Sequence, residues 1–167
     1  GPCGVFEGDD ELLLFDGYEL HSDASIMGFG AEFSIEEGAG VEEGESALTW
    51  VNGGDGESVA AFSFNDDESS GLLDLSDVFG ANDASLWFEF NTLYNGPMQV
   101  HIWNFGDVVV GHLEISGDGT WQHYMIDMDS FSHEEEWGGE DFDPDSINMI
   151  AFYIDYGDDG VTHRFCI

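Results

Sequence analysis

The segment 85–128 constrains the fold most, because apolar residues alternate there with polar and aromatic ones. Side chains of a β-strand point to alternate faces, so one face of each strand can join a core while the other meets solvent or a ligand. In the stretch 98–105, Met98, Val100 and Ile102 have the inward parity. The outward parity of the same stretch belongs to Gln99, His101 and Trp103.

Strand-like stretches run along the whole chain, separated by clusters of Gly, Asp and Asn that suit turns. They predict strands at 12–15, 30–35, 47–51, 58–64, 85–92, 98–105, 108–115, 121–128, 147–155 and 161–167. Helical periodicity is almost absent, apart from a short helical turn expected within 72–79. The pattern predicts an all-β fold, an antiparallel β-sandwich of the jelly-roll type. The expected core residues share the inward parity: Leu86, Phe88, Phe90, Val100, Ile102, Tyr124, Ile126, Ile150, Phe152 and Phe165.

Length and hydrophobic content predict one domain with one core over residues 1–167. The dipeptide Gly1-Pro2 resembles the scar of a protease-cleavage site, and we see no signal peptide, so a natural leader is expected to have been removed. No stretch approaches the roughly 20 apolar residues that a membrane-spanning helix needs.

The formal net charge is −36, and Arg164 is the only Lys or Arg. Nucleic acids and anionic membranes attract basic groups, so this charge argues against both as partners. Like charges also oppose the compact state, an effect that salt and bound divalent cations reduce. The protein is therefore expected to work in saline, Ca²⁺-containing surroundings, as in a halophilic or marine setting.

Several short strings occur in an order that resembles one known family. They are 13–17 (LLFDG), 73–76 (LDLS), 85–90 (SLWFEF), 119–122 (GTWQ), 128–131 (MDSF), 147–154 (INMIAFYI) and 164–167 (RFCI). Together they are similar to family 11 carbohydrate-binding modules and their galactose-binding-like relatives, over residues 12–167. The resemblance implies a non-catalytic module of a secreted polysaccharide-degrading enzyme, which binds glucan in a groove on one sheet. It also implies a secreted or cell-surface location and a monomer within a larger multidomain protein.

A sugar ring presents apolar C–H faces and polar edges, so its site needs aromatic planes together with hydrogen-bonding side chains. The loop after Phe131 and the strand 147–155 contribute to the groove by resemblance. Plain structural roles remain open, with Trp103 covering a sheet edge and Trp137 filling a loop. The candidate ligand-binding residues are Trp137, Tyr153, Trp103, His101, Gln99, Asn148, Glu136 and Asp155. Because the chain is so acidic, a neutral polysaccharide such as a β-glucan is the expected ligand.

The resemblance also implies a structural Ca²⁺, which prefers hard oxygen ligands. Asp16, Glu42 and Glu43 are the expected metal ligands, although ordinary surface acids would give the same pattern in a chain with 37 Asp and Glu. Cys3 and Cys166 lie near opposite ends of the chain, and either a disulfide or two free thiols fit this placement.

Two other classes of function compete with polysaccharide binding. One is a Ca²⁺-stabilised structural or adhesive module of a large cell-surface protein. The other is an enzyme in which Glu89 and Glu114 form the carboxylate pair of a glycoside hydrolase, which requires a separation of roughly 5 to 10 Å. No nucleophile motif of the G-x-S-x-G type accompanies that pair.

Overall fold

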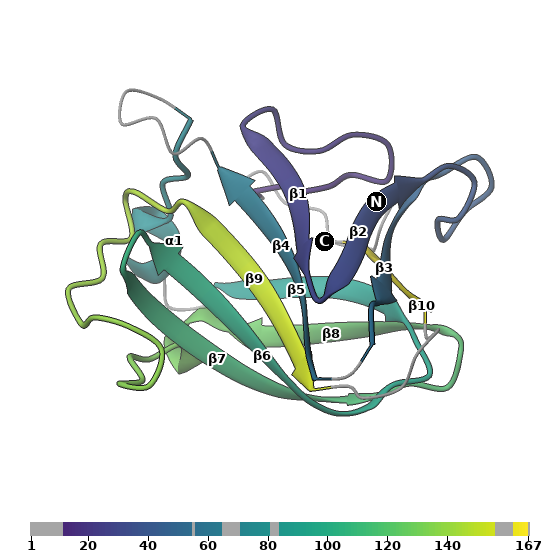
Figure 1. Cartoon of the computed structure of the whole chain (residues 1–167). Helices are drawn as coiled ribbons and strands as arrows, with labels where there is room; N and C mark the ends of the chain where they lie inside the picture. Colours follow the sequence, from purple (N-terminus) through teal and green to yellow (C-terminus); the bar gives the residue numbers. More distant parts are fainter. Residues whose placement is uncertain (1–11, 55, 65–70, 81–83, 156–161, 167) are drawn as a thin grey trace.

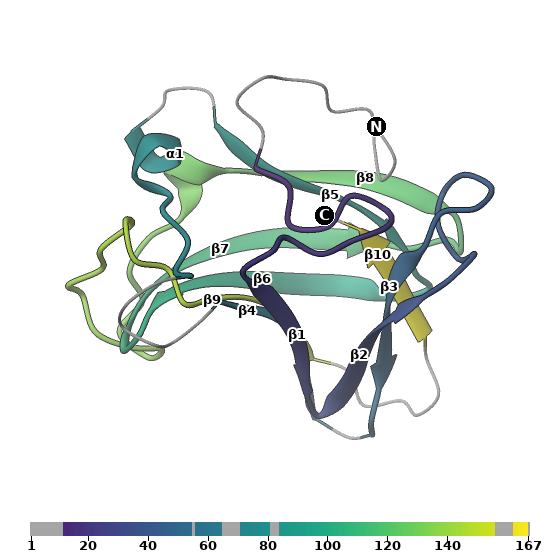
Figure 2. The same ribbon diagram turned by 90° about the horizontal axis from the view of Figure 1, so that it is seen from above.

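Two five-stranded antiparallel sheets pack face to face, as Figure 1 and the view from above in Figure 2 show. The computed structural model describes residues 12–54, 56–64, 71–80 and 84–155, and the backbone of 162–166. The first sheet has the order β1 (Ala24–Phe29), β4 (Glu57–Phe64), β9 (Met149–Asp155), β6 (Asn95–Asn104) and β7 (Asp107–Ser116). The second has the order β2 (Ala31–Glu36), β3 (Ala47–Asn52), β10 (Thr162–Cys166), β5 (Ser85–Asn91) and β8 (Trp121–Asp127).

The core between the sheets is the one that strand parity predicts. Phe88 of β5 meets Phe152 of β9 edge to face, with ring centroids 5.6 Å apart, so aromatic packing joins the two sheets. Leu86 and Tyr124 are partly buried against the same core, and Phe165 lies outside the described side chains. The other predicted core residues are all buried: Phe88, Phe90, Val100, Ile102, Ile126, Ile150 and Phe152. Each large apolar side chain buried here contributes roughly 1.5 to 3 kcal/mol.

The first strand of the structure differs from the prediction. Residues 12–15 form only an isolated bridge between Phe15 and Leu20, because Asp16 Oδ1 accepts the backbone N–H groups of Tyr18 and Glu19 and turns the chain. The first strand is instead β1, which the sequence did not indicate. Its outward residues include Met27 and Phe29, so apolar and polar residues do not alternate along it.

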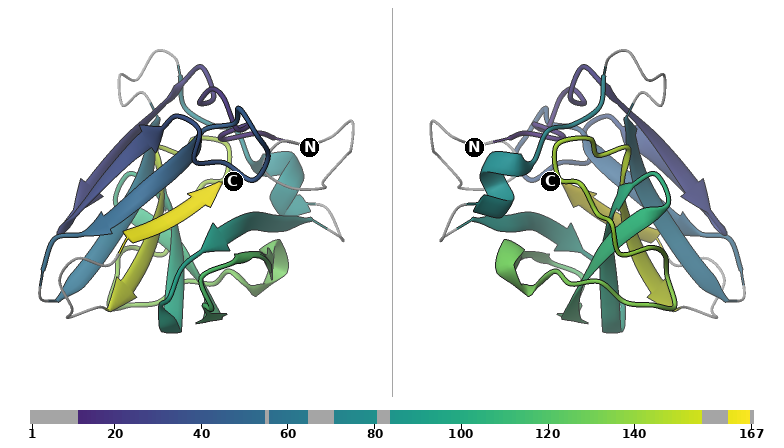
Figure 3. Two further views of the ribbon diagram at one scale, coloured as in Figure 1. Left: turned by 90° about the vertical axis from the view of Figure 1, so that its right-hand side faces the viewer. Right: turned by 90° about the vertical axis from the view of Figure 1, so that its left-hand side faces the viewer.

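The turn from β1 to β2 carries the chain from the first sheet to the second. The two strands meet at this corner and diverge from it in Figures 1 and 2, and Figure 3 shows the corner from the two sides. Gly30 has φ +62°, a backbone conformation that residues with a side chain rarely adopt. A Cβ on Gly28 would overlap the carbonyl oxygen of Ala31. Glycine is therefore required at both positions of this corner.

The remaining elements agree with the prediction to within a few residues. The helical turn expected within 72–79 is α1 (Ser76–Gly80), and Asp74 Oδ1 accepts the backbone N–H of Ser76 at its start. A short 3-10 turn, η1 (Met128–Ser130), follows β8. No helix among the described residues is long and apolar enough to cross a membrane. The possible pairing of Cys3 with Cys166 falls outside the described residues.

Candidate functional site

The outer face of the first sheet carries three rows of side chains that cross all five strands. The rows follow from the strand register, in the order β1, β4, β9, β6 and β7. The first is Phe29, Val59, Tyr153, Gln99 and His112. The second is Met27, Ala61, Ala151, His101 and Val110. The third is Ser25, Ser63, Met149, Trp103 and Val108. This face therefore combines apolar, aromatic and hydrogen-bonding groups.

An aromatic cluster surrounds His101 on this face. Tyr153 stacks on the imidazole with ring centroids 3.9 Å apart and planes 22° apart. Trp137, from the loop 131–146, meets the same imidazole edge to face at 4.6 Å, and Trp103 lies at 6.0 Å. His101 is 0% exposed as a result. We refer to His101, Trp103, Trp137 and Tyr153 as the aromatic cluster.

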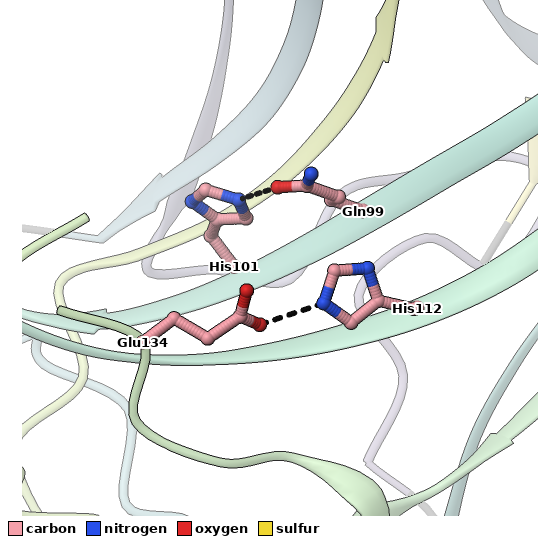
Figure 4. Close-up of polar contacts among 4 residues, drawn as sticks. All are labelled: Gln99, His101, His112 and Glu134. Carbon is pink, nitrogen blue, oxygen red and sulfur yellow. Dashed lines mark hydrogen bonds and ion pairs between the residues drawn. The ribbon is translucent and has the colours of Figure 1, made fainter. Parts of the chain in front are cut away.

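The hydrogen bond between His101 and Gln99 fixes the protonation pattern of the imidazole. His101 Nε2 lies 2.9 Å from Gln99 Oε1 (Figure 4). An amide oxygen only accepts, so Nε2 donates and Nδ1 of the neutral ring is an acceptor. Burial, with a smaller contribution from nearby His112, lowers the pKa of His101 from 6.5 to about 4. The ring is therefore neutral at neutral pH.

Polar atoms of the aromatic cluster are buried without a hydrogen-bond partner among the described residues. They include Nδ1 of His101 and Nε1 of Trp137. A buried polar group without a partner typically costs about 1 to 3 kcal/mol. Nε1 of Trp103 is a third such atom, so the closed cluster contains an acceptor at His101 and indole donors that a bound ligand could satisfy.

The loop 131–146 reaches the face because it is attached beside β7. Ser132 exchanges backbone hydrogen bonds with Val110, at N–O distances of 2.8 and 3.1 Å. Beyond Trp137, a Cβ on Gly138 would lie 2.8 Å from the carbonyl oxygen of Gly106 and 3.3 Å from the Trp103 ring. Glycine at this position lets the loop lie against the sheet and places the Trp137 ring over His101.

The face carries carboxyl groups and no Lys or Arg. Glu57 and Asp155 are paired across β4 and β9, one row beyond Tyr153. Burial and the neighbouring Asp155 carboxylate raise the pKa of Glu57. Burial, and next Glu57, raise the pKa of the Tyr153 hydroxyl. The only Lys or Arg of the chain, Arg164, is in β10 of the other sheet.

The structure brings five of the eight predicted ligand-binding residues together. Gln99, His101, Trp103, Trp137 and Tyr153 lie together on the outer face, although His101 is covered rather than open to solvent. Asp155 is exposed on the same face, one row away from Tyr153.

Two of the predicted residues lie apart from the aromatic cluster. Glu136 is exposed in the turn before Trp137. Asn148 precedes β9 rather than lying in it, and its Oδ1 accepts the backbone N–H of Phe105 at 2.7 Å. Phe105 has φ 58°, so Asn148 stabilises the turn between β6 and β7.

The apolar part of the face was not predicted from the sequence. Met27 and Phe29 of β1 are 39% and 51% exposed. Beside them, Val59, Ala61 and Ala151 form a small buried apolar cluster on the same outer face. Because β1 has apolar residues on both faces, its sequence lacks the alternation of apolar and polar residues that predicts a strand.

The predicted metal region contains a carboxylate that the sequence analysis missed. Glu42 and Glu43 are exposed, whereas Glu45 is 1% exposed and its Oε2 has no partner in the described part of the chain. Burial raises the pKa of Glu45, and the neighbouring Glu42 carboxyl raises it further. The turn at Asp16 is adjacent, because the backbone N–H of Ser46 donates to the carbonyl oxygen of Gly17 at 2.7 Å.

The donor set fits a hard cation only in part. A buried carboxylate oxygen next to a second carboxyl suits Ca²⁺. However, the described residues contain no group of three or more His, Cys, Asp or Glu that could hold a metal. No sequence signal separates Glu45 from Glu42 and Glu43, because all three lie in one acidic run.

The carboxylate pair of the enzyme alternative is not formed. Glu89 has the outward parity of β5 in the second sheet, and Glu114 has the outward parity of β7 in the first. The two side chains are therefore on opposite outer faces of the sandwich. They cannot act together on one glycosidic bond.

No protein-family model matches the chain, and no curated protein matches it. Solved structures do match. One is an exo-β-agarase, with a TM-score of 0.62 and 17% identity, covering 93% of this chain and 24% of that chain. Another is a family 11 carbohydrate-binding module from Clostridium thermocellum in complex with a β-1,3-1,4-mixed-linked tetrasaccharide, with a TM-score of 0.54 and 16% identity, covering 92% and 91% of the two chains. A family 29 carbohydrate-binding module matches with a TM-score of 0.56 and 16% identity, covering 92% and 82%.

The chain has the fold of carbohydrate-binding modules. This fold agrees with the β-sandwich that the sequence predicts. The chain spans about a quarter of the length of the exo-β-agarase and nearly the whole of the family 11 module.

Proposed function

We propose that the chain is a non-catalytic module that binds a neutral polysaccharide on the outer face of the first sheet. The observation that carries the proposal is the aromatic cluster, in which rings and buried hydrogen-bonding atoms without partners occur together. The likeness to solved carbohydrate-binding modules supports it.

The chemistry of the aromatic cluster suits a sugar. Trp137 and Tyr153 offer aromatic planes for the apolar C–H face of a pyranose ring. His101 Nδ1 accepts a hydrogen bond from a hydroxyl group, while Trp137 Nε1 and the Gln99 amide donate to hydroxyl oxygens. Met27 and Phe29 extend the apolar surface across β1.

The charge of the face favours a neutral chain. Uronate-rich and sulfated polymers would meet Glu57 and Asp155 without a Lys or Arg on the same sheet. A β-glucan is the first candidate, because the family 11 module above is in complex with a β-1,3-1,4-mixed-linked tetrasaccharide. A related plant or algal chain is the second, in view of the exo-β-agarase.

The same proposal covers the setting of the module. It belongs to a secreted or cell-surface polysaccharide-degrading protein, within a longer chain, and acts as a monomer without cleaving its ligand. The net charge of −36 suits saline surroundings, where salt screens repulsion between carboxylates.

A structural Ca²⁺ is part of the proposal. Glu45 and Glu42 would supply two of its oxygen ligands, and the turn at Asp16 and Glu43 lie close by. When bound, the cation would neutralise the buried Glu45 carboxylate and stabilise the folded state.

Affinity gel electrophoresis tests the function. The wild-type protein is run in gels that contain mixed-linkage β-glucan, agarose or a sulfated galactan, and reducing sugar is assayed in parallel. We expect retardation by a neutral polymer without release of reducing sugar. Retardation only by the sulfated polymer would contradict a neutral ligand. Release of reducing sugar would indicate an enzyme, and no retardation by any polymer would favour a structural module.

A further inference from the structure

The Trp137 segment, residues 132–139, closes the route to His101. The imidazole is fully buried, and its acceptor Nδ1 lacks a partner among the described residues. His101 and Tyr153 belong to β6 and β9, and each of these strands is paired on both sides. Their backbones are therefore held by the sheet, whereas Trp137 comes from a loop, so displacement of Trp137 is the route to Nδ1 that leaves the sheet intact.

The segment is anchored to the sheet at both ends. Its first residue, Ser132, is bonded to Val110 through the backbone of both residues. Its last residue, Gly139, donates its backbone N–H to the carbonyl oxygen of Gly106 at 3.0 Å. The residues between these two anchors must be held by other contacts.

One side-chain pair holds the middle of the segment. His112 Nε2 on β7 lies 2.6 Å from Glu134 Oε2, and Figure 4 shows the Glu134 side chain reaching from the loop to the His112 ring. The backbone carbonyl of the same Glu134 accepts the N–H of Trp137 at 3.1 Å. The turn that carries the Trp137 ring is therefore built on the residue that binds His112.

We propose that the Trp137 segment is a cover that the polysaccharide displaces, and that the His112–Glu134 pair positions this cover and sets how readily it opens. The inference rests on the proposed function and concerns the entry of the ligand into the same site. Opening gives Nδ1 of His101 and Nε1 of Trp137 access to new hydrogen-bond partners, and it frees the Trp137 ring to stack on the sugar.

The pair is a weak one, which suits a cover that has to open. The side chains of His112 and Glu134 are 55% and 25% exposed. Exposed pairs contribute little to stability, so loss of this pair is expected to change the opening equilibrium by about twofold to fivefold. His112 and Glu134 act through Trp137 and are positioning residues.

The first test needs no ligand. Hydrogen exchange of the Trp137 indole N–H is followed by NMR in the wild type, in Glu134→Ala and in Glu135→Ala. Glu135 is the neighbouring, exposed glutamate, so the control makes the same change of charge. We expect exchange about two to five times faster in Glu134→Ala only. The backbone amides of Ile102 and Phe152 in the core monitor global opening and should not change. Equal indole exchange in the two variants would overturn the proposal.

The second test uses the β-1,3-1,4-mixed-linked tetrasaccharide in stopped-flow fluorescence. We expect its association rate to rise about two- to fivefold in Glu134→Ala and to stay at the wild-type value in Glu135→Ala. Equal association rates would overturn the role of the cover in ligand entry, even if indole exchange rises. If the wild type binds neither this probe nor any polymer of the gel panel, the proposed function and ligand displacement of the cover both fail. The indole exchange then still decides whether the pair positions Trp137.

Discussion

The imidazole of His101 stacks on the phenol ring of Tyr153 at 3.9 Å, although the two residues lie more than fifty positions apart in the chain. Their strands, β6 and β9, are neighbours in the first sheet, and Gln99 is opposite Tyr153 in the register. The pairing of these two central strands therefore places the ring that stacks and the amide that orients the imidazole on one face.

Burial of His101 makes the stability of the protein depend on pH. Its pKa falls from 6.5 to about 4 in the folded state, so the unfolded chain binds the proton more tightly. The contribution of neutral His101 to the free energy of unfolding is fully present above pH 6.5 and is lost as the pH falls toward 4. The loss is expected to reach about 3 kcal/mol. Urea unfolding from pH 7 to pH 4, for the wild type and His101→Gln, measures it.

The comparison with His101→Gln isolates this residue from the many carboxyl groups that titrate in the same range. The difference in unfolding free energy between the two proteins should be constant above pH 6.5 and shrink below it. Parallel profiles down to pH 4 would show that the imidazole is not buried in a neutral form.

Replacing Trp137 should weaken polysaccharide binding. Truncation of an aromatic anchor in an interface weakens binding, and we expect Trp137→Ala to cost roughly 1 to 3 kcal/mol of binding free energy, which is about tenfold to a hundredfold in Kd. Calorimetric titration with the best polymer from the gel screen gives the value. Trp87→Ala is the matched control, because Trp87 stacks on His123 on the outer face of the other sheet. Equal losses in both variants would place the site elsewhere.

Added Ca²⁺ should stabilise the protein more than NaCl of the same ionic strength. NaCl only screens the repulsion between carboxylates, whereas Ca²⁺ at Glu45 would also bind the folded state alone. Such binding raises the free energy of unfolding by about 2.7 kcal/mol when the free Ca²⁺ concentration is a hundredfold above Kd. Thermal melts of EDTA-treated protein with NaCl, MgCl₂ or CaCl₂ check this expectation. Glu45→Gln should remove the Ca²⁺-specific part, and Glu37→Gln, at an exposed acid of another turn, should keep it. A Tm that CaCl₂ and EDTA leave unchanged would exclude the site.

The corner between β1 and β2 should not tolerate a side chain at Gly28. The added Cβ would overlap the backbone of Ala31, and we expect Gly28→Ala to cost about 1 to 3 kcal/mol of unfolding free energy. Gly80→Ala at the end of α1 is the control, because a Cβ there meets no atom within 4 Å. Urea midpoints decide the point, and a Gly28→Ala protein as stable as Gly80→Ala would contradict the described corner.

Local patterning predicted the strands whose inward and outward residues differ in polarity. β6 is such a strand, and its parity placed Gln99 and His101 on the outer face correctly. β1 was missed because Met27 and Phe29 are apolar although they face outward. Residues 12–15 have the apolar composition of a strand, but the turn at Asp16 overrides that propensity.

The geometry of the candidate site depends on contacts between distant parts of the chain, which local patterning cannot predict. Trp137 was predicted as a ligand-binding residue from a resemblance, yet its position over His101 follows from backbone pairing of Ser132 with Val110 in a distant strand. The loop that carries Glu45 is attached in the same way to the turn at Gly17, through the backbone of Ser46. Such contacts join residues far apart in sequence, so neither periodicity nor spacing reveals them.

Because β10 lies in the middle of the second sheet, cleavage of this strand by a protease reports unfolding of the sheet. Trypsin cleaves after Lys or Arg, and Arg164 in β10 is the only such residue in this chain. Its backbone is paired with β3 on one side and β5 on the other, so a protease cannot bind it in an extended form while the sheet is intact. The rate of one tryptic cut therefore measures the fraction of molecules in which the central strand has left both neighbours.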